Sequence, residues 1–359
     1  MAKSSKSYQS ALHEKDGINP PESFSSSSAN SIKSHRRKQP SAEDLVKGII
    51  SGNVTALSRA ITLVESTNPK HLKKANAIIT ACLAYANKST RIGITGVPGV
   101  GKSTFIEAFG LHLTHLKKKV AVLAVDPSST LSQGSILGDK TRMEDLVKDT
   151  NAFIRPSPSG DSLGGVARKT RETIILCEAA GYDTILIETV GVGQSETAVH
   201  SMVDFFLLLK LAGAGDELQG IKRGIIEMAD AIIINKADGD NIKAAKSAKL
   251  EFNRALHLYP EKASGWTPKT ALCSALKQEG ISEIWDMITE YVNHTKANLY
   301  FETHRTEQNK FWLLQTIEDR LKSNFYNRKT IKTELQSQID LIEAGKTTPF
   351  AAAEYLLSL

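Results

Sequence analysis

Between Arg91 and Leu276, short apolar runs alternate with stretches of helical periodicity. Six of these runs are apolar at nearly every position and are bounded by polar residues or glycine. They are RIGITG (91–96), VAVLAVD (120–126), DTILIET (183–189), DFFLLLK (204–210), DAIIINK (230–236) and TALCSA (270–275). Strands that are buried on both faces lack polar alternation, so these runs predict a mainly parallel sheet covered by helices on each side.

Apolar residues three and four positions apart predict helices before and after this alternating region. The segment SAEDLVKGIISG, at 41–52, starts with a serine cap followed by acidic residues and ends at a glycine, as helices prefer. Further helical segments cover 54–67, 71–87, 281–292, 309–326, 334–345 and 350–359. The pattern therefore predicts an α/β domain with a helical segment on either side.

The first 40 residues differ from the rest in composition. They are rich in serine and poor in large apolar residues, as in SFSSSSANS, which is typical of a disordered segment. They hold seven Lys and Arg against three Asp and Glu, so +4 of the formal net charge of +6 belongs to this tail. An organellar transit peptide is the alternative, and the three acidic residues weigh against it. We therefore expect a cytoplasmic protein, or one of the mitochondrial matrix if the source is eukaryotic.

Composition excludes several classes of function. No apolar stretch reaches the roughly 18 residues of a membrane helix, and the longest, VDFFLLL, ends at Lys210. Outside the tail the charges nearly balance, which argues against a large face that binds nucleic acid. The widely spaced Cys82, Cys177 and Cys273 show no metal-ligand pattern, so we expect buried structural roles in a reducing compartment.

The stretch GVPGVGKST matches the phosphate-binding pattern G-x-x-x-x-G-K-[ST] and lies between a predicted strand and a predicted helix. Its glycines allow turns that point backbone N–H groups at phosphate oxygens, and the helix adds the positive end of its dipole. We expect Lys102 to reach the β- and γ-phosphates and Ser103 to ligate Mg²⁺. The predicted phosphate-binding residues are Gly96, Val97, Pro98, Gly99, Val100, Gly101, Lys102, Ser103 and Thr104.

The motif NKAD, which ends the predicted strand 230–236, indicates which base the site binds. The carboxylate of Asp238 can accept hydrogen bonds from the ring N–H and the exocyclic amine of guanine, and adenine offers no such pair of donors. The next predicted strand ends in CSAL, whose backbone is expected to close over the base. The predicted ligand is therefore GTP, and its guanine-site residues are Asn235, Lys236, Asp238, Ser274, Ala275 and Leu276.

Acidic residues at or after predicted strand ends are candidates for binding Mg²⁺ or its water ligands. Asp126 and Glu188 stand at strand ends, and Asp139 lies in the loop that follows Asp126. The alternative for Asp126 is a turn cap, and for Asp139 a solvated loop acid. The predicted metal ligands are Ser103, Asp126, Asp139 and Glu188, and the predicted catalytic residues are Lys102, Asp126 and Glu188.

The segment ETVGVGQSE predicts slow intrinsic hydrolysis. Gly191 is expected to bring a backbone N–H to the γ-phosphate. The residue after it is Val192, close to the position at which Ras-like GTPases carry the glutamine that orients the attacking water. Gln194 lies too far along the chain to replace that glutamine, so another component is expected to stimulate the reaction.

Together these motifs resemble the methylmalonyl-CoA mutase-associated GTPases, a family in the SIMIBI class of P-loop proteins. The resemblance runs from about residue 41 to the C-terminus, and its most specific motif is LAGAGDELQGIKRGI, which general GTPases lack. It implies a P-loop NTPase fold with an N-terminal helical extension and a C-terminal helical dimerisation arm. The expected divisions are the tail at 1–40, the helical segment at 41–89, the GTPase domain at 90–295 and the arm at 296–359.

The resemblance also implies a function. Members of this family are GTPases that chaperone an adenosylcobalamin-dependent mutase, gate its cofactor loading from an adenosyltransferase, and protect or reactivate it. The implied partners are GTP and GDP, methylmalonyl-CoA mutase or a relative, a cobalamin adenosyltransferase and a second copy of the chain. A third switch loop is implied, with Asp216, Glu217 and Lys222 as its working residues and Glu188 as their contact at the nucleotide.

Three points remain open at the level of sequence. The aromatic residues Phe311, Trp312 and Phe325 fit an intersubunit core in the dimerisation arm, or else they pack on their own domain. A GTPase that inserts nickel or zinc shares this branch of the fold, but the nine histidines are scattered and no cysteine pair collects metal. A kinase linked to amino-acid transport is the other alternative, and NKAD argues against an enzyme that uses ATP.

Overall fold

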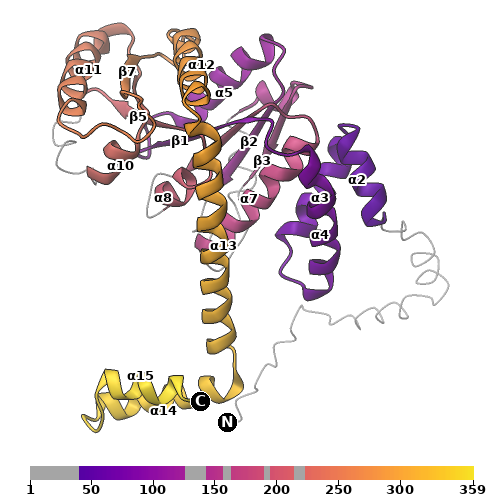
Figure 1. Ribbon diagram of the computed structural model, residues 1–359. Helices are drawn as coiled ribbons and strands as arrows, with labels where there is room; N and C mark the ends of the chain where they lie inside the picture. Colours follow the sequence, from indigo (N-terminus) through magenta and orange to yellow (C-terminus); the bar gives the residue numbers. More distant parts are fainter. Residues whose placement is uncertain (1–39, 126–142, 157–162, 190–194, 214–222) are drawn as a thin grey trace, which may run out of the picture. The chain divides into compact units, whose positions relative to one another are not determined.

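The computed structural model describes residues 40–125, 143–156, 163–189, 195–213 and 223–359. The chain divides into two units, Met1–Ser41 and Ala42–Leu359, and the second contains all of the elements below (Figure 1). Its strands are β1 (Thr90–Gly96), β2 (Val120–Val125), β3 (Ala152–Arg155), β4 (Thr184–Thr189), β5 (Phe205–Leu211), β6 (Ala231–Asn235) and β7 (Lys269–Leu272). Its helices are α2 (Ala42–Ile50), α3 (Val54–Glu65), α4 (Pro69–Cys82), α5 (Lys102–His115), α7 (Leu163–Ala179), α8 (Ser195–His200), α10 (Arg223–Met228), α11 (Ile242–Leu256), α12 (Ile281–Ala297), α13 (Tyr300–Tyr326), α14 (Lys329–Glu343) and α15 (Pro349–Leu357).

The strands form one parallel sheet in the order β3-β2-β4-β1-β5-β6-β7. β1 lies between β4 and β5, so its last residue, Gly96, reaches the edge at which the carboxyl ends of the strands meet. Six of the strands are the predicted ones. The seventh, β3, was not predicted, because its four residues include the polar Arg155 and pair with β2 alone.

Alternate residues of each strand pack against helices on opposite faces of the sheet. Leu123 and Val125 of β2 belong to a buried core shared with α2, α3, α4 and α7. Val120 and Val122 of the same strand belong to the core shared with α5 and α12. A third cluster joins β5 and β6 to α10 and α11. The predicted parallel sheet with helices on both faces is confirmed.

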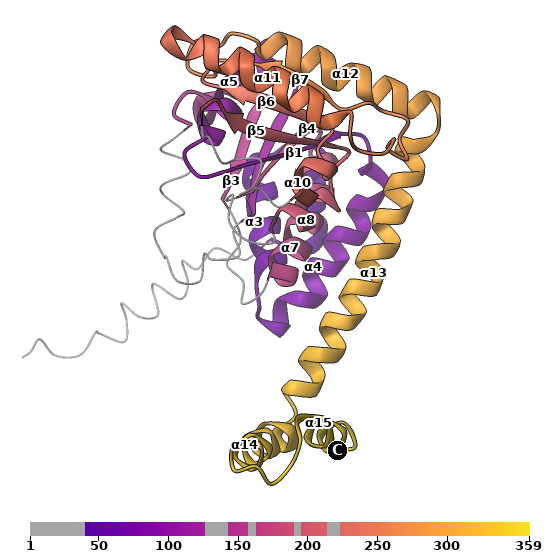
Figure 2. The same ribbon diagram turned by 90° about the vertical axis from the view of Figure 1, so that its left-hand side faces the viewer.

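Helix α13 connects the α/β body to α14 and α15, which pack against each other beyond it (Figure 2). The first half of α13 lies against the body. Trp312 is 7% exposed, and its Nε1 donates a hydrogen bond to the carbonyl oxygen of Ser201 at 3.1 Å. The expectation that Trp312 forms part of an intersubunit core is therefore wrong, because this side chain packs on its own domain. Phe311, the residue before it, is exposed.

A buried group of charged side chains fixes α13 to the amino-terminal edge of the sheet. Nε and Nη2 of Arg305 each donate to the carboxylate of Asp204 at 2.7 Å, and Nη2 also donates to the carbonyl of Ser89 at 2.6 Å. The backbone N–H of Arg91 donates to Asp204 at 2.8 Å, and its guanidinium pairs with Glu178 at 2.9 Å. Buried charges need such pairing, so removing one partner of these pairs would leave an uncompensated charge between α13 and the sheet.

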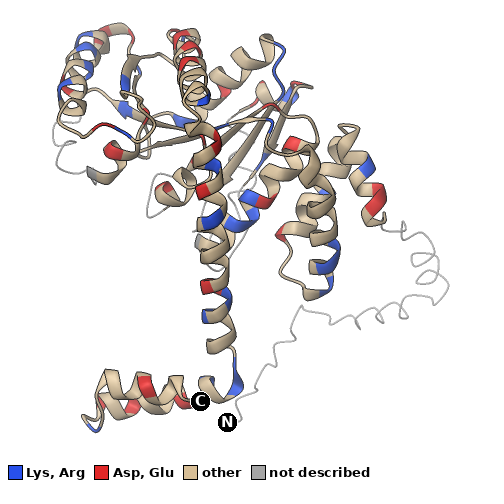
Figure 3. Ribbon diagram, in the orientation of Figure 1, with Lys and Arg blue, Asp and Glu red and all other residues tan. Residues whose placement is uncertain are grey.

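Two further expectations concern composition. In the described part of the chain, no helix is long and apolar enough to cross a membrane. The three cysteines are free thiols, and all of them are buried as predicted. Figure 3 shows both acidic and basic residues on the drawn elements, in line with the near balance of charge outside the first 40 residues.

Candidate nucleotide-binding site

The turn between β1 and α5 lies at the carboxyl edge of the sheet. Gly101, which precedes α5, adopts φ 93° and ψ 33°, and a Cβ atom there would lie 2.8 Å from Nδ2 of Asn235. Glycine alone tolerates both the left-handed conformation and this close approach. Val100 is fully buried, whereas Pro98 and Gly99 are exposed. Residues 96–104 thus form one strand, turn and helix start, with the outer side of the turn open to solvent.

The side chain of Lys102, in the first turn of α5, folds back over this turn. Its Nζ donates to the carbonyl oxygens of Gly96 at 2.8 Å and Val97 at 3.3 Å. Burial lowers the pKa of this ammonium, whereas the nearby carboxylates of Glu188 and Glu196 raise it. The ammonium is therefore a largely desolvated cation in the field of two carboxylates, which suits it to pairing with phosphate oxygens.

Ser103, in the first turn of α5, lies close to Glu188 of β4. Oγ of Ser103 lies 3.5 Å from Oε1 of Glu188, which stands one residue before the end of β4 and is in register with Ile94 of β1. Beside it, the hydroxyl of Thr189 donates to Oγ1 of Thr95 at 2.8 Å, and both side chains are buried. The ends of the two strands are therefore joined where the phosphate-binding turn begins.

Asn235, at the end of β6, connects the phosphate-binding turn to the loop after β7. Its Nδ2 donates to the carbonyl of Val100 at 2.9 Å, and its Oδ1 accepts from the backbone N–H of Ala275 at 3.1 Å. The thiol of Cys273 donates to the same Oδ1 at 3.3 Å. Burial raises the pKa of that thiol to about 12, so it stays protonated and unreactive.

The remaining residues of the NKAD motif extend this connection. Lys236 has a positive φ of 58°, and its Nζ donates to the carbonyl of Gly99 at 3.0 Å, a second link to the phosphate-binding turn. The carboxylate of Asp238 accepts a hydrogen bond from the hydroxyl of Ser274. Leu276 is 81% exposed at the rim of the same loop. The structure therefore brings the phosphate-binding turn, NKAD and the loop after β7 to one edge of the sheet.

Six of the predicted site residues lie outside the described residues. They are Asp126, Asp139, Gly191, Asp216, Glu217 and Lys222. The predicted metal site is therefore described only through Ser103 and Glu188. In the described ranges, no group of three or more His, Cys, Asp or Glu side chains is arranged to hold a metal ion.

One buried acid near the site was not predicted. Glu196, in the first turn of α8, is 5% exposed and acts electrostatically on Lys102. It stands within the motif ETVGVGQSE, so an acid at this position was visible in the sequence. The direction in which the side chain of Glu196 points could not be predicted, because the pattern of a six-residue helix does not show which of its faces packs toward the phosphate-binding turn.

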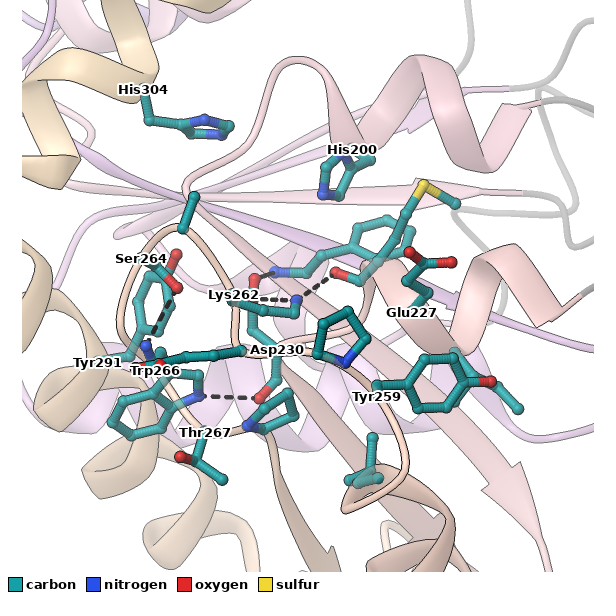
Figure 4. Close-up of a pocket in the computed structure, with 18 of the residues that line it drawn as sticks. His200, Glu227, Asp230, Tyr259, Lys262, Ser264, Trp266, Thr267, Tyr291 and His304 are labelled. Atoms are coloured by element: carbon teal, nitrogen blue, oxygen red, sulfur yellow. Dashed lines mark hydrogen bonds and ion pairs between the residues drawn. The ribbon is translucent and has the colours of Figure 1, made fainter.

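A separate cavity of about 780 Å³ lies at the opposite, amino-terminal edge of the sheet (Figure 4). Lys262 donates to Asp230 at 2.7 Å within it, and His200 and His304 contribute imidazole rings to its wall. Burial lowers the pKa of His200 to about 4 and lowers that of His304 as well, so both rings are neutral near pH 7. None of the predicted nucleotide-binding residues lines this cavity.

A parallel sheet with a P-loop after its central strand and an N-K-x-D motif that begins at the last residue of β6 defines a P-loop GTPase, an enzyme that hydrolyses GTP. A comparison with known protein families shows to which family of P-loop GTPases the chain belongs. The chain belongs to the family described as Methylmalonyl Co-A mutase-associated GTPase MeaB, whose model matches residues 57–330.

Individual relatives agree with this assignment. A protein of Mycobacterium bovis named "Probable GTPase" is 47% identical over 319 residues, which cover 88% of this chain and 94% of the relative. The Mus musculus protein named "Methylmalonic aciduria type A homolog, mitochondrial" is 44% identical over 331 residues, which cover 89% of this chain and 80% of the relative. A solved structure described as "LAO/AO transport system kinase" is 36% identical, has a TM-score of 0.72, and matches 88% of this chain and 96% of its own.

Proposed function

We propose that this GTPase is a chaperone of an adenosylcobalamin-dependent acyl-CoA mutase, with methylmalonyl-CoA mutase as the first candidate. The observation that carries the proposal is the match of residues 57–330 to a mutase-associated family. The 44% identity to a mitochondrial protein named after methylmalonic aciduria supports it. In this proposal, GTP hydrolysis gates cofactor loading from a cobalamin adenosyltransferase and protects or reactivates the mutase.

The roles proposed for the site follow from its described contacts. The backbone N–H groups of 96–104 and the ammonium of Lys102 bind the phosphates, and Lys102 stabilises negative charge that develops during hydrolysis. Asp238 accepts from the guanine base, while the loop 274–276 closes over it. Asn235 and Lys236 fix the base-binding residues relative to the phosphate-binding turn through their hydrogen bonds to that turn.

A magnesium ion fits the oxygen donors at the phosphate end of this site. The hydroxyl of Ser103 and the carboxylate of Glu188 lie 3.5 Å apart, and both are hard ligands of the kind that Mg²⁺ prefers. We assign Asp126 and Asp139 to the same site, directly or through water, and the N–H of Gly191 to the γ-phosphate. A bound Mg²⁺ ion would neutralise part of the negative charge on the phosphates of GTP.

The third switch is proposed to transmit the nucleotide state to the mutase. Its residues Asp216, Glu217 and Lys222 are separate from the P-loop and from NKAD, which supply the affinity for GTP. Substitutions in this segment should therefore abolish the stimulation of GTP hydrolysis by the mutase and leave GTP binding intact. Allosteric coupling is typically about 1–3 kcal/mol, which corresponds to a response of roughly 5- to 150-fold.

The test is steady-state GTPase activity with and without purified methylmalonyl-CoA mutase, and in parallel with isobutyryl-CoA mutase. The unmodified protein should be slow alone and stimulated by its own partner. Lys222→Ala and Asp216→Ala should bind GTP within about threefold of normal and lose most of that stimulation. Lys102→Ala is the control that should lose hydrolysis itself. Stimulation that survives in both switch variants, or a collapse of GTP affinity in them, would contradict the proposal.

Homodimerisation through the C-terminal arm is part of the same proposal. The outer half of α13 exposes large apolar side chains, among them Leu313 at 63%, Leu314 at 61% and Leu321 at 63%. Phe350, in the first turn of α15, is 85% exposed. A surface of this kind favours association with another protein, and a second copy is the partner proposed here.

A further inference from the structure

The hydroxyls of Thr95 and Thr189 meet where β1 and β4 end. The backbone pairing of these two strands ends at Ile94 and Glu188, so both threonines stand one residue beyond it. The hydroxyl of Thr189 donates a hydrogen bond to Oγ1 of Thr95 at 2.8 Å. This side-chain bond therefore continues the connection between the two strands past the point at which their backbone pairing ends.

The pair of threonines is buried on an apolar face of the sheet. Thr189 is fully buried, and Thr95 is 1% exposed. Side chains alternate along a strand, so Thr189 shares its face with Ile185 and Ile187, which belong to the core beside α7. A buried hydroxyl costs free energy unless it is hydrogen-bonded, and here each hydroxyl has the other as its partner. Valine has nearly the same shape as threonine, so packing alone does not account for two threonines at this point.

Each threonine is the chain neighbour of a group in the nucleotide site. Thr95 precedes Gly96, whose carbonyl oxygen accepts a hydrogen bond from Nζ of Lys102 at 2.8 Å. Thr189 follows Glu188, whose carboxylate lies beside the first turn of α5. Neighbouring side chains of a strand point to opposite faces, so Glu188 faces α5 while Thr189 is bonded on the other face. The hydroxyl bond thus joins the residue before the phosphate-binding turn to the residue after the carboxylate.

We propose that Thr95 and Thr189 are positioning residues for GTP hydrolysis. Their bond holds the carboxylate of Glu188 in a fixed place relative to the phosphate-binding turn. The affinity for nucleotide comes from that turn and from NKAD, whereas hydrolysis also depends on the carboxylate of Glu188. A displacement of about 1 Å in a reacting site can cost about 100-fold in rate, so loss of this bond should lower hydrolysis far more than affinity. The inference rests on the role proposed for Glu188 and requires no mutase.

Valine substitutions in the full chain separate this role from a role in stability. Thr95→Val or Thr189→Val alone leaves the other hydroxyl buried without its partner, whereas the double variant removes both hydroxyls and keeps the shape. Urea unfolding should therefore show a loss of stability in each single variant and a recovery of most of it in the double variant. Single-turnover hydrolysis by the protein alone, at saturating GTP and Mg²⁺, should be slower by about tenfold or more in all of these variants. Their affinities for GTP and GDP, measured by titration, should stay within about threefold of normal.

Further variants serve as controls. Thr189→Ser keeps the hydroxyl and should hydrolyse GTP within about threefold of the normal rate. Thr184→Val removes the hydroxyl of a threonine that is 1% exposed at the other end of β4, and it should leave hydrolysis unchanged. Glu188→Gln should be slow, and a normal rate in it would contradict the role of that carboxylate and the inference together. If Glu188→Gln is slow, a stable double valine variant that hydrolyses GTP at the normal rate, or that loses affinity in parallel with the rate, overturns the inference alone.

Discussion

At the scale of single residues, base recognition and phosphate binding are physically joined. Asn235 donates to Val100, Lys236 donates to Gly99, and both acceptors belong to the phosphate-binding turn. The carboxylate of Asp238 is held by Ser274 from the loop after β7. A change that disturbs the amide of Asn235 would therefore affect two binding elements, whereas a change at Asp238 is confined to the base.

Asp238→Asn should weaken GTP binding and favour xanthosine triphosphate. The amide offers the donor that the 2-oxo group of xanthine needs, and the loss of a carboxylate acceptor for two base donors costs about 1.5–3 kcal/mol for each bond. We expect a loss of GTP affinity of at least about tenfold, measured by titration with both nucleotides. The matched control is Asp240→Asn, an exposed acid two residues further on. Full GTP affinity in Asp238→Asn would refute the assignment of this residue to the base.

At the scale of elements, apolar pattern and motif context predicted most of what positions the site. Six strands were visible as runs that are apolar on both faces, and the P-loop and NKAD followed at their ends. β3 was not visible, because a four-residue edge strand with Arg155 has no distinct period. The sequence also could not predict where Trp312 packs, since an aromatic residue on an amphipathic helix fits a subunit interface as well as the core of its own domain. The direction of Glu196 depends on how α8 is docked, which is a tertiary property.

The contribution of the buried pair Arg305–Asp204 to stability can be tested by a substitution of Arg305. Arg305→Met leaves the carboxylate of Asp204 buried without its guanidinium, and removing one partner of a buried pair costs about 3–5 kcal/mol. Urea unfolding should show this loss in the free energy of unfolding. Arg320→Met, at an exposed position of α13, should change it by less than about 0.5 kcal/mol. Adding Asp204→Asn to Arg305→Met should restore part of the loss, and a further loss instead would argue against charge burial as the cause.

His200 at the end of α8 and His304 of α13 predict that the stability of the protein depends on pH. His200 has a pKa of about 4 in the folded chain because of burial, opposed by Asp230 and reinforced by Lys262 and His304. Its unfolded value is about 6.5, so the unfolded chain binds the extra proton first as the pH falls. The contribution of neutral His200 is fully present above about pH 6.5 and is lost as the pH falls toward 4, by up to about 3 kcal/mol.

Urea unfolding at about pH 7.5 and about pH 5 measures this dependence. The free energy of unfolding should decrease at the lower pH. His200→Gln, which cannot titrate, should show a smaller decrease, with the remainder due to His304 and the carboxylates. An equal decrease in the variant and the unmodified protein would show that His200 does not titrate as its burial requires.

At the scale of the whole molecule, the position of a truncation decides what it tests. A cut after Asn298 removes Arg305 and Trp312 together with the arm, so it damages the body as well as any interface. A cut after Asn327 keeps both residues and removes α14 and α15.

Residues 1–327 should be folded, with GTP affinity within about twofold of the full chain, because every nucleotide motif lies upstream. They should dimerise more weakly than the full chain, because they keep the exposed apolar residues of α13 and lose Phe350 of α15. The full chain should be a dimer. Light scattering after gel filtration measures the mass of each, and Leu314→Glu in the full chain tests the contribution of α13 without truncation. A dimer of 1–327 that is as stable as that of the full chain would place the interface outside α14 and α15.

The pair formed by Asp204 and Arg305 also bears on how the chain is made. The two residues are 101 positions apart, and ribosomes add about 5–20 residues per second, so about 5–20 seconds separate their synthesis. During that interval the nascent sheet carries a carboxylate whose guanidinium partner has not yet been translated. The strands can assemble, but their amino-terminal edge is completed only when α13 emerges. The amino-terminal edge of the sheet, far from the nucleotide site, is therefore expected to be the last part of the body to reach its native contacts.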